Sequence, residues 1–468
     1  MQNFLSYIIE CVKIFKNNLS NEPVRIVGHL DCDGITASSI LIKAFYRENI
    51  KFVYSSNRQL NEKTIIELKK EHYKIIFFAD FGSNLLDIIN EELNEKKIFI
   101  LDHHKFQDIK KSVKTEIYNI NPNKFGIDDN FICGSGIAYL FSKCLNKKNK
   151  SLAYIALIGA IGDMQDINGF SELNKYILND SIESNDIEIK IGLSMFGLQT
   201  KPLYKLLQFS TEIFIPGVTG DENGAKMFLN NLGIDLIDKN GNYRKIFDLN
   251  KEETNKLITA IIISRIGIEN NPENILGNIY LLKREEDGVP TRDAREFSTL
   301  INACGRLNMP SLGVGACLND KRSKEKAFEL LRDYKNEIIN SLNWVDKNRK
   351  TENIIEREKL IIINSKNNIR DTVIGTVNSI LTKSGLFENG TIIVSMAYSI
   401  DNNIKISLRS VNNSNIDLGS IIKDVCECLN GAGGGHPNAA GGLIQLDKEK
   451  EFIEKIVLKL NKLEIEEK

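Results

Sequence analysis

Short apolar segments alternate with amphipathic segments between Met1 and Gln165, and this alternation restricts the fold more than any other feature of the sequence. The apolar segments are short and rich in β-branched or aromatic residues: Val24–Leu30, Lys51–Tyr54, Lys74–Ala79 and Lys97–Leu101. Amphipathic segments follow them at Ala37–Tyr46, Asn61–Glu71 and Asn84–Asn94. Strand and helix signals at this spacing predict βαβ units arranged around a parallel sheet.

The remainder of the chain changes pattern twice. Residues 186–355 are mainly helical in pattern and are interrupted by turn signals such as Pro216-Gly217. The charged stretch Trp344–Lys359 is either a linker or a solvated helix end. A second α/β pattern then has strands at Leu360–Asn364, Thr391–Met396 and Asn403–Leu408, and helices at Asp371–Lys383, Leu418–Cys428 and Lys448–Leu463. We therefore expect domains at 1–185 and 356–468, joined by a mainly helical region at 186–355.

Composition excludes several classes of protein. The 468 residues are 42% hydrophobic and 26% charged, as in a globular chain of two or three domains. Lys and Arg number 61 against 62 Asp and Glu, so a polybasic surface is not the main binding device. No apolar run is long enough for a membrane span. Eight cysteines in an irregular pattern, with no export signal, predict reduced thiols and a cytoplasmic location.

Aspartate and histidine gather where the predicted strands end. Four clusters contain them: Gly28–Gly34, Phe78–Ser83, Ile100–Lys105 and Gly159–Asp166. Ligands of open parallel sheets lie beyond the carboxyl ends of the strands, so these clusters are expected to converge. Convergence would join the carboxylates and imidazoles of His29, Asp31, Asp33, Asp80, His103 and Asp163.

Such a group of side chains points to divalent cations. Several carboxylates cannot share a small site in ionised form unless cations balance them. Oxygen donors with some imidazole and no thiolate suit Mn²⁺ or Mg²⁺ better than structural zinc. The donors exceed the needs of one ion, and two ions are the usual arrangement for phosphoryl chemistry. For any single cluster, a turn or helix cap is the alternative interpretation.

These residues resemble the motifs of a known family, the DHH phosphoesterase superfamily. The resemblance lies in Asp31-Cys32-Asp33-Gly34, Asp80, Asp102-His103-His104 and Gly162-Asp163. Near the C-terminus, Gly433–Gly441 with Ser407–Ser410 upstream resembles the companion DHHA1 domain. In the middle region, Lys201–Tyr204 and Phe214–Glu222 are similar to archaeal RecJ-like nucleases. The implied architecture is an α/β protein with a DHH domain, a helical middle segment and a DHHA1 domain, with the active site in the interdomain cleft.

The resemblance also implies roles for the site residues. Two Mn²⁺ ions, or Mg²⁺ in their place, would be held by Asp31, Asp33, Asp80, His103 and Asp163, with Asp80 as the bridge. His29 would be a further ligand or would support one. Asp102 would orient a neighbouring imidazole, and His104 would approach the scissile phosphate. Water activated by the ions would attack, so no Ser or Cys nucleophile is required.

The glycine-rich stretch can be interpreted without the resemblance. Consecutive glycines in a loop let backbone N–H groups turn toward one anion, although a flexible turn is the alternative. Arg409 and His436 would add positive charge. The predicted substrate-binding residues are Ser407, Arg409, Gly433, Gly434, Gly435 and His436. Three arginines of the middle region, Arg292, Arg295 and Arg306, either contact phosphate or pair within the protein.

The resemblance implies an exonuclease for single-stranded DNA or RNA, releasing mononucleotides from a 5′ end in DNA repair and replication. The GINS complex beside the replicative helicase is a candidate partner, and no membrane is expected. One alternative is a phosphodiesterase for oligoribonucleotides or dinucleotides. Another is a replication scaffold without catalysis. No 2′-OH reader is recognisable, so the sequence leaves DNA and RNA both open.

Overall fold

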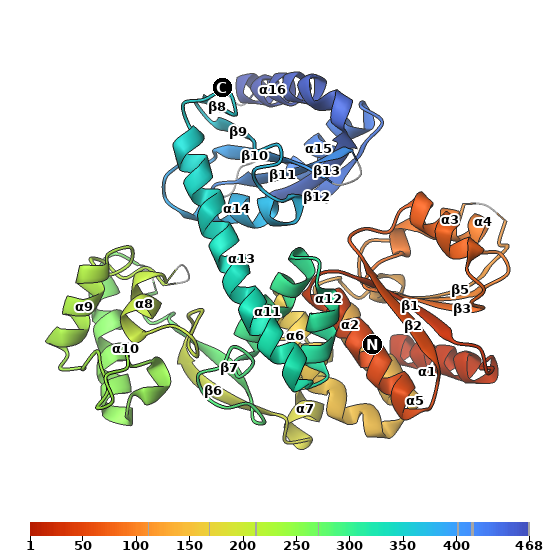
Figure 1. Cartoon of the computed structure of the whole chain (residues 1–468), viewed down its shortest axis with the longest axis horizontal. Coiled ribbons are helices and arrows are strands. Elements are labelled where there is room, and N and C mark those ends of the chain that lie inside the picture. Colours follow the sequence, from red (N-terminus) through yellow and green to blue (C-terminus); the bar gives the residue numbers. More distant parts are fainter. Residues whose placement is uncertain are drawn as a thin grey trace. The chain divides into compact units, whose positions relative to one another are not determined.

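Residues 1–110, 112–167, 169–210, 213–269, 271–399, 402–412 and 416–466 are described by a computed structural model. The chain divides into two compact units, Met1–Leu331 and Arg332–Lys468, which we describe one at a time. Figure 1 shows the elements of both.

The first unit is built on a five-stranded parallel sheet with the strand order β2-β1-β3-β4-β5. Its strands are β1 (Val24–His29), β2 (Phe52–Asn57), β3 (Ile75–Ala79), β4 (Lys97–Leu101) and β5 (Glu116–Ile120). The predicted parallel sheet is confirmed, together with four of its strands. β5 was not predicted, because it lies at the edge of the sheet and is buried only toward its C-terminal end.

Helices cover both faces of this sheet. They are α1 (Gln2–Asn17), α2 (Cys32–Arg47), α3 (Glu62–Lys70), α4 (Leu86–Glu92), α5 (Gly134–Leu145) and α6 (Ala153–Gly162). Because side chains alternate along a strand, Phe77 and Phe78 of β3 face opposite sides. Phe77 packs against Phe15, Phe45 and Phe141 of the helices on one side. Phe78 belongs to the core formed with α3 and α4.

The middle region is mainly helical, as predicted. Its helices are α8 (Leu203–Gln208), α9 (Glu222–Asn231), α10 (Lys251–Arg265), α11 (Ala294–Arg306), α12 (Pro310–Cys317) and α13 (Lys321–Asn348), and α7 (Glu172–Glu183) precedes the region. β6 (Ile187–Leu193) and β7 (Leu276–Leu282) add an antiparallel pair that the sequence did not reveal. α11 supports the start of α2, because Asn302 Oδ1 accepts a hydrogen bond from the Cys32 amide at 2.9 Å.

The second unit contains a six-stranded mixed sheet with the order β12-β13-β11-β10-β9-β8. Its elements are β8 (Ile354–Arg357), β9 (Leu360–Asn364), α14 (Asp371–Lys383), β10 (Ile392–Tyr398), β11 (Asn403–Ser410), α15 (Leu418–Glu427), β12 (Ala432–His436), β13 (Ala439–Gln445) and α16 (Glu449–Glu466). Ile404, Ile406 and Leu408 of β11 belong to the core. Lys405, Ser407 and Arg409 alternate with them and therefore face the other side of the sheet.

One expectation for this unit is wrong. The glycine-rich stretch is not a loop but a β-hairpin, in which Gly433 pairs with Gly442 and Gly434 with Gly441. A Cβ at Gly433 would lie 2.6 Å from the Ile422 carbonyl oxygen, so α15 can approach only a strand of small residues here. The glycines therefore serve close packing along the hairpin as well as any contact with a ligand.

Two further features bear on the class of protein. No helix among the described residues is long and apolar enough to cross a membrane. All eight cysteines are free, and Cys144 and Cys428 are the exposed ones.

Candidate metal centre

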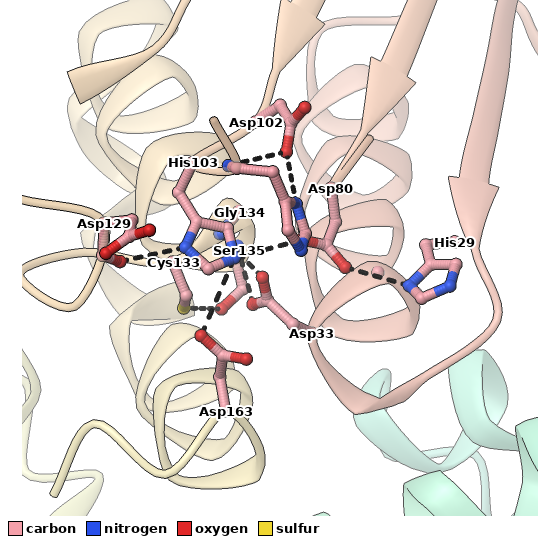
Figure 2. A network of polar contacts seen from close by, with 12 residues as sticks. His29, Asp33, Asp80, Asp102, His103, Asp129, Cys133, Gly134, Ser135 and Asp163 are labelled. Carbon is pink, nitrogen blue, oxygen red and sulfur yellow. Dashed lines mark hydrogen bonds and ion pairs between the residues drawn. The ribbon is translucent and has the colours of Figure 1, made fainter. Parts of the chain in front are cut away.

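The predicted site residues of the first unit meet at the carboxyl edge of its parallel sheet, as Figure 2 shows for most of them. β1 ends in His29, Asp80 follows β3, and Asp102 to His104 follow β4. The N-cap and first turn of α2 supply Asp31 and Asp33, and the C-cap of α6 supplies Asp163. The clusters therefore converge although more than 130 residues separate the first from the last, a separation counted from Asp31 and Asp163.

Helix termini fix the first two carboxylates. Asp31 caps α2, with Oδ1 accepting a hydrogen bond from the Gly34 amide at 3.0 Å. Both oxygens of Asp33 accept hydrogen bonds from the first turn of α5: Oδ2 from the Gly134 amide at 2.6 Å and Oδ1 from the Ser135 amide at 2.9 Å. The orientation of Asp33 is thus set by a helix that begins a hundred residues later in the chain.

Asp80 lies at the centre of the cluster. Its backbone has a φ of 69°, which is costly for a residue with a Cβ and is typical of functional sites. Its side chain is 1% exposed, with Oδ2 3.2 Å from His29 Nδ1 and Oδ1 3.6 Å from His103 Nε2. Burial, followed by the charges of Asp33 and Asp31, raises the pKa of Asp80 well above its usual value.

His103 is oriented by its own backbone neighbourhood. Its Nδ1 donates a hydrogen bond to the Asp129 carbonyl oxygen at 2.9 Å, which leaves Nε2 as the nitrogen with the lone pair. Nε2 lies 3.6 Å from Asp163 Oδ2 as well as from Asp80 Oδ1. Burial raises the pKa of Asp163 to about 7, despite the opposing effect of His103.

His104 and Asp102 form an ion pair beside these ligands. Asp102 Oδ1 accepts a hydrogen bond from His104 Nδ1 at 2.7 Å, and its Oδ2 accepts one from the Ser83 amide at 2.9 Å. Burial alone would lower the pKa of His104, but the bond to Asp102 outweighs it and raises that pKa to about 9. Burial opposes the shift of Asp102 too, yet the bond from His104 lowers its pKa to about 2. The half-exposed His104 therefore presents a protonated nitrogen at the site.

His29 pairs with two carboxylates. Its Nδ1 lies 3.0 Å from Asp31 Oδ2 and 3.2 Å from Asp80 Oδ2. Burial would lower the pKa of His29, but the Asp31 carboxylate outweighs burial and raises it. His29 thus balances part of the negative charge of the cluster when it is protonated.

The residues fit a divalent cation. Asp80 Oδ1 and His103 Nε2 are buried and have no hydrogen-bond partner among the described residues. Buried polar atoms are rarely left unpaired, and an ion at this position would satisfy both. Two sets of donors, Asp80 with His103 and His104, and Asp80 with His29 and Asp31, have ligand atoms within 4.8 Å of one another. Asp80 belongs to both sets.

Supporting residues that sequence reasoning missed surround these ligands. Gln165 Nε2 donates hydrogen bonds to Asp163 Oδ2 at 3.2 Å and to the Asp129 carbonyl oxygen at 3.1 Å. Asn121 and Asn123 donate to the carbonyl oxygens of His104 and His103, each at 2.8 Å. The asparagines follow β5, the strand that was not predicted. Their position directly after a strand was the only feature of the sequence that could have marked them as site residues.

The second unit also brings its predicted residues together. Ser407 pairs with Gly441, and Arg409 with Ala439, so both lie beside the glycine hairpin that contains Gly433, Gly434, Gly435 and the exposed His436. Arg409 Nη1 donates to the carbonyl oxygens of Leu408 at 2.7 Å and Ala440 at 3.3 Å. Lys405 was missed: a Cβ added at Gly441 would lie 3.6 Å from its Nζ.

The arginines of the middle region make contacts within the protein. Arg292 is paired with Asp287 at 2.9 Å and Glu188 at 2.6 Å. Arg295 pairs with Asp166 at 2.8 Å. For these two side chains, pairing within the protein is the interpretation that the structure favours.

An Asp/His cluster at the carboxyl edge of a parallel α/β sheet lies where such domains bind their ligands, and its donor atoms suit a divalent cation. The chain belongs to the DHH/DHHA1 superfamily. It matches the DHH family, N-terminal domain, over residues 23–161, the DHH-CID domain over 195–276 and the DHHA1 domain over 359–462. An uncharacterised protein of Methanocaldococcus jannaschii is 30% identical over 467 residues, which cover 97% of this chain and 98% of that protein.

Solved structures share the fold. RecJ from Thermus thermophilus, in complex with Mn²⁺, has a TM-score of 0.57 at 14% identity; 96% of this chain is covered, and the chain spans 54% of that protein. An exonuclease RecJ bound to manganese has a TM-score of 0.55 at 14% identity, and the match covers 96% of this chain and 93% of that protein. CDC45 from Entamoeba histolytica has a TM-score of 0.64 at 12% identity, and the match covers 96% of this chain and 98% of that protein. Family membership and the Asp/His cluster together support a phosphoesterase that uses a divalent metal.

Proposed function

We propose that this chain is a two-metal exonuclease that releases mononucleotides from single-stranded nucleic acid, acting from the 5′ end of DNA in repair or replication. The observation that carries the proposal is the pair of donor sets that share Asp80, in which the buried atoms Asp80 Oδ1 and His103 Nε2 have no hydrogen-bond partner among the described residues. The fold shared with RecJ proteins that were solved with Mn²⁺ supports the choice of metal.

In this proposal the metal ligands are those that the sequence predicted: Asp31, Asp33, Asp80, His103 and Asp163. When bound, Mn²⁺ or Mg²⁺ lowers the pKa of water and offsets negative charge on the phosphate. His29 holds Asp80 in place through its contact with Oδ2. Asp33 keeps its orientation because the α5 amides bind both of its oxygens.

His104 would act as a proton donor and would not bind the metal. Asp102 binds its Nδ1, which fixes the ring and stabilises the protonated form. The remaining N–H of His104 can then donate to the scissile phosphate and deliver a proton to the departing oxygen. Neither step requires a nucleophilic Ser or Cys.

The second unit would bind the substrate. Ser407, Arg409, Gly433, Gly434, Gly435 and His436, with Lys405 beside Gly441, would hold a phosphate of the nucleic-acid strand. Arg409 is already oriented by the Leu408 and Ala440 carbonyl oxygens, so little side-chain freedom would be lost on binding.

The test is Mn²⁺-dependent digestion of matched single-stranded DNA and RNA, each labelled at one end, alongside a dinucleotide. We expect labelled mononucleotides from the 5′ end of DNA, and no product with Asp80→Ala or Asp163→Ala. Cleavage of the dinucleotide alone would indicate a small-substrate phosphodiesterase. Inactivity on all three substrates with Mn²⁺ present would instead favour a non-catalytic scaffold.

A further inference from the structure

The turn that follows α6 has an unusual residue at its critical position. α6 ends at Gly162 with Asp163 as its C-cap, and the Met164 amide donates to the Ile161 carbonyl oxygen at 3.1 Å and the Gln165 amide to that of Ala160 at 2.9 Å. This is the Schellman arrangement, in which the residue at the position of Met164 is left-handed and is usually glycine. Met164 has a φ of 60° and so carries the strain that glycine would avoid.

Packing does not offset this strain, because the Met164 side chain is 63% exposed. Two more large apolar side chains are exposed on the neighbouring turns, Phe131 at 45% and Ile167 at 63%. An exposed methionine in a position that disfavours it has no structural benefit in the free protein. Exposed apolar side chains beside a polar site are typical of ligand contacts.

Hydrogen bonds hold these turns together and attach them to the metal ligands. The Asp129 carbonyl oxygen accepts from both His103 Nδ1 and Gln165 Nε2, and the Phe131 carbonyl oxygen accepts from Ser171 Oγ. Met164 directly follows Asp163, so their Cα atoms are about 3.8 Å apart. Met164 and Phe131 therefore belong to turns that are hydrogen-bonded to residues around the cluster.

We propose that Met164, together with Phe131 and Ile167, is a specificity-determining surface that contacts the nucleoside of the nucleotide being released. The inference rests on the proposed function and adds the substrate class. A base and its sugar are covalently attached to the phosphate, so Met164, one residue from the proposed ligand Asp163, lies within their reach. A thioether packs well on an aromatic ring, and every base offers one. A polyphosphate chain has no apolar part that could use this surface.

Met164→Gly tests the proposal, because glycine relieves the strain while it removes the side chain. We expect a higher midpoint of thermal unfolding, a KM for a single-stranded oligonucleotide raised about threefold to tenfold, and little change in kcat. Met164→Leu should restore the KM. An oligonucleotide with an abasic residue at the end that is cleaved first should have similar KM values with wild-type protein and Met164→Gly.

Met227, which is also 63% exposed but lies in α9, supplies the matched control. Met227→Ala should leave the KM unchanged. An unchanged KM in Met164→Gly, or a loss of stability in that variant, would overturn the inference. The proposed function would still stand if the wild-type protein hydrolysed the oligonucleotide. Failure of the wild type to hydrolyse any oligonucleotide would overturn both.

Discussion

The Asp129 carbonyl oxygen accepts hydrogen bonds from two side chains, one of a proposed metal ligand and one that supports another. His103 donates to it directly, and Gln165 joins it to Asp163 through one amide group. Gln165 Oε1 in turn accepts from the buried Asn174 at 2.9 Å. Because supporting hydrogen bonds fix ligand orientation, Gln165 should influence the affinity for metal without touching the ion.

Gln165→Leu keeps much of the side-chain volume and removes its hydrogen bonds. We expect Mn²⁺ affinity to fall about 10- to 100-fold, measured by isothermal titration calorimetry. Gln199→Leu is the control, since Gln199 is also buried and accepts a bond from the Gly288 amide, but in the middle region. Equal Mn²⁺ affinities for the two variants would contradict a positioning role for Gln165.

Asp80 should lower the free energy of unfolding of the protein when no metal is present. Its pKa is raised by burial and by neighbouring carboxylates, so at neutral pH the native state must either bury the charge or take up a proton. Asp80→Asn resembles the protonated form. In EDTA at pH 7.5 we expect its free energy of unfolding in urea to exceed that of wild type by on the order of 1–2 kcal/mol. A less stable variant would show that Asp80 is not under this strain.

Ligands and supporting residues differed in how well the sequence predicted them. Asp80 and His103 could be predicted as candidate ligands because several Asp/His clusters follow strands of one parallel sheet, whose carboxyl ends meet at one edge. Gln165 and Asn123 were not, because neutral amides are common in turns. Their contribution depends on partners such as Asn174 and the His103 backbone, which no local pattern reveals.

At the scale of elements, the first turn of α5 holds two of the ligands in place. A Cβ at Gly134 would lie 2.8 Å from Asp80 Cβ and 2.9 Å from Asp33 Oδ2, so nothing larger than glycine fits. Gly136, two residues further along the same helix, is also crowded. A Cβ there would lie 2.6 Å from Ile132 Cγ1, away from the carboxylates.

These two glycines give a matched pair of variants. We expect Gly134→Ala and Gly136→Ala each to lose about 1–3 kcal/mol of unfolding free energy through overpacking. Only Gly134→Ala should also lose at least tenfold in Mn²⁺ affinity, because it displaces Asp33 and Asp80. If calorimetry gave Gly134→Ala the affinity of Gly136→Ala, the contact between α5 and the ligands would be unimportant.

Burial decided which strands could be predicted. β3 is buried along its whole length and gives a continuous apolar run, whereas β6 is exposed at its three central positions. β6 also pairs with β7, about 90 residues away, so its partner is not visible locally. The hairpin of β12 and β13 was mistaken for a loop because its strands are specified by the close approach of α15. Strands that depend on such distant contacts have no signal of their own in the sequence.

At the scale of the whole molecule, the metal cluster and the lone tryptophan lie in different units. The ligands all belong to Met1–Leu331, and Trp344 belongs to Arg332–Lys468. Each unit has its own hydrophobic core. Tryptophan fluorescence therefore reports the unfolding of the second unit, and far-UV circular dichroism reports both.

This separation predicts where metal stabilises the protein. A ligand that binds only the native state stabilises it by about 2.7 kcal/mol at a concentration 100 times its Kd. Adding Mn²⁺ to EDTA-treated protein should raise the midpoint of the circular-dichroism transition and leave that of Trp344 fluorescence in place. In Asp80→Asn neither transition should move, because a shared ligand is missing. An equal shift of both signals in the wild type would mean that the two units unfold together, and a shift of the fluorescence signal alone would place the metal in the second unit.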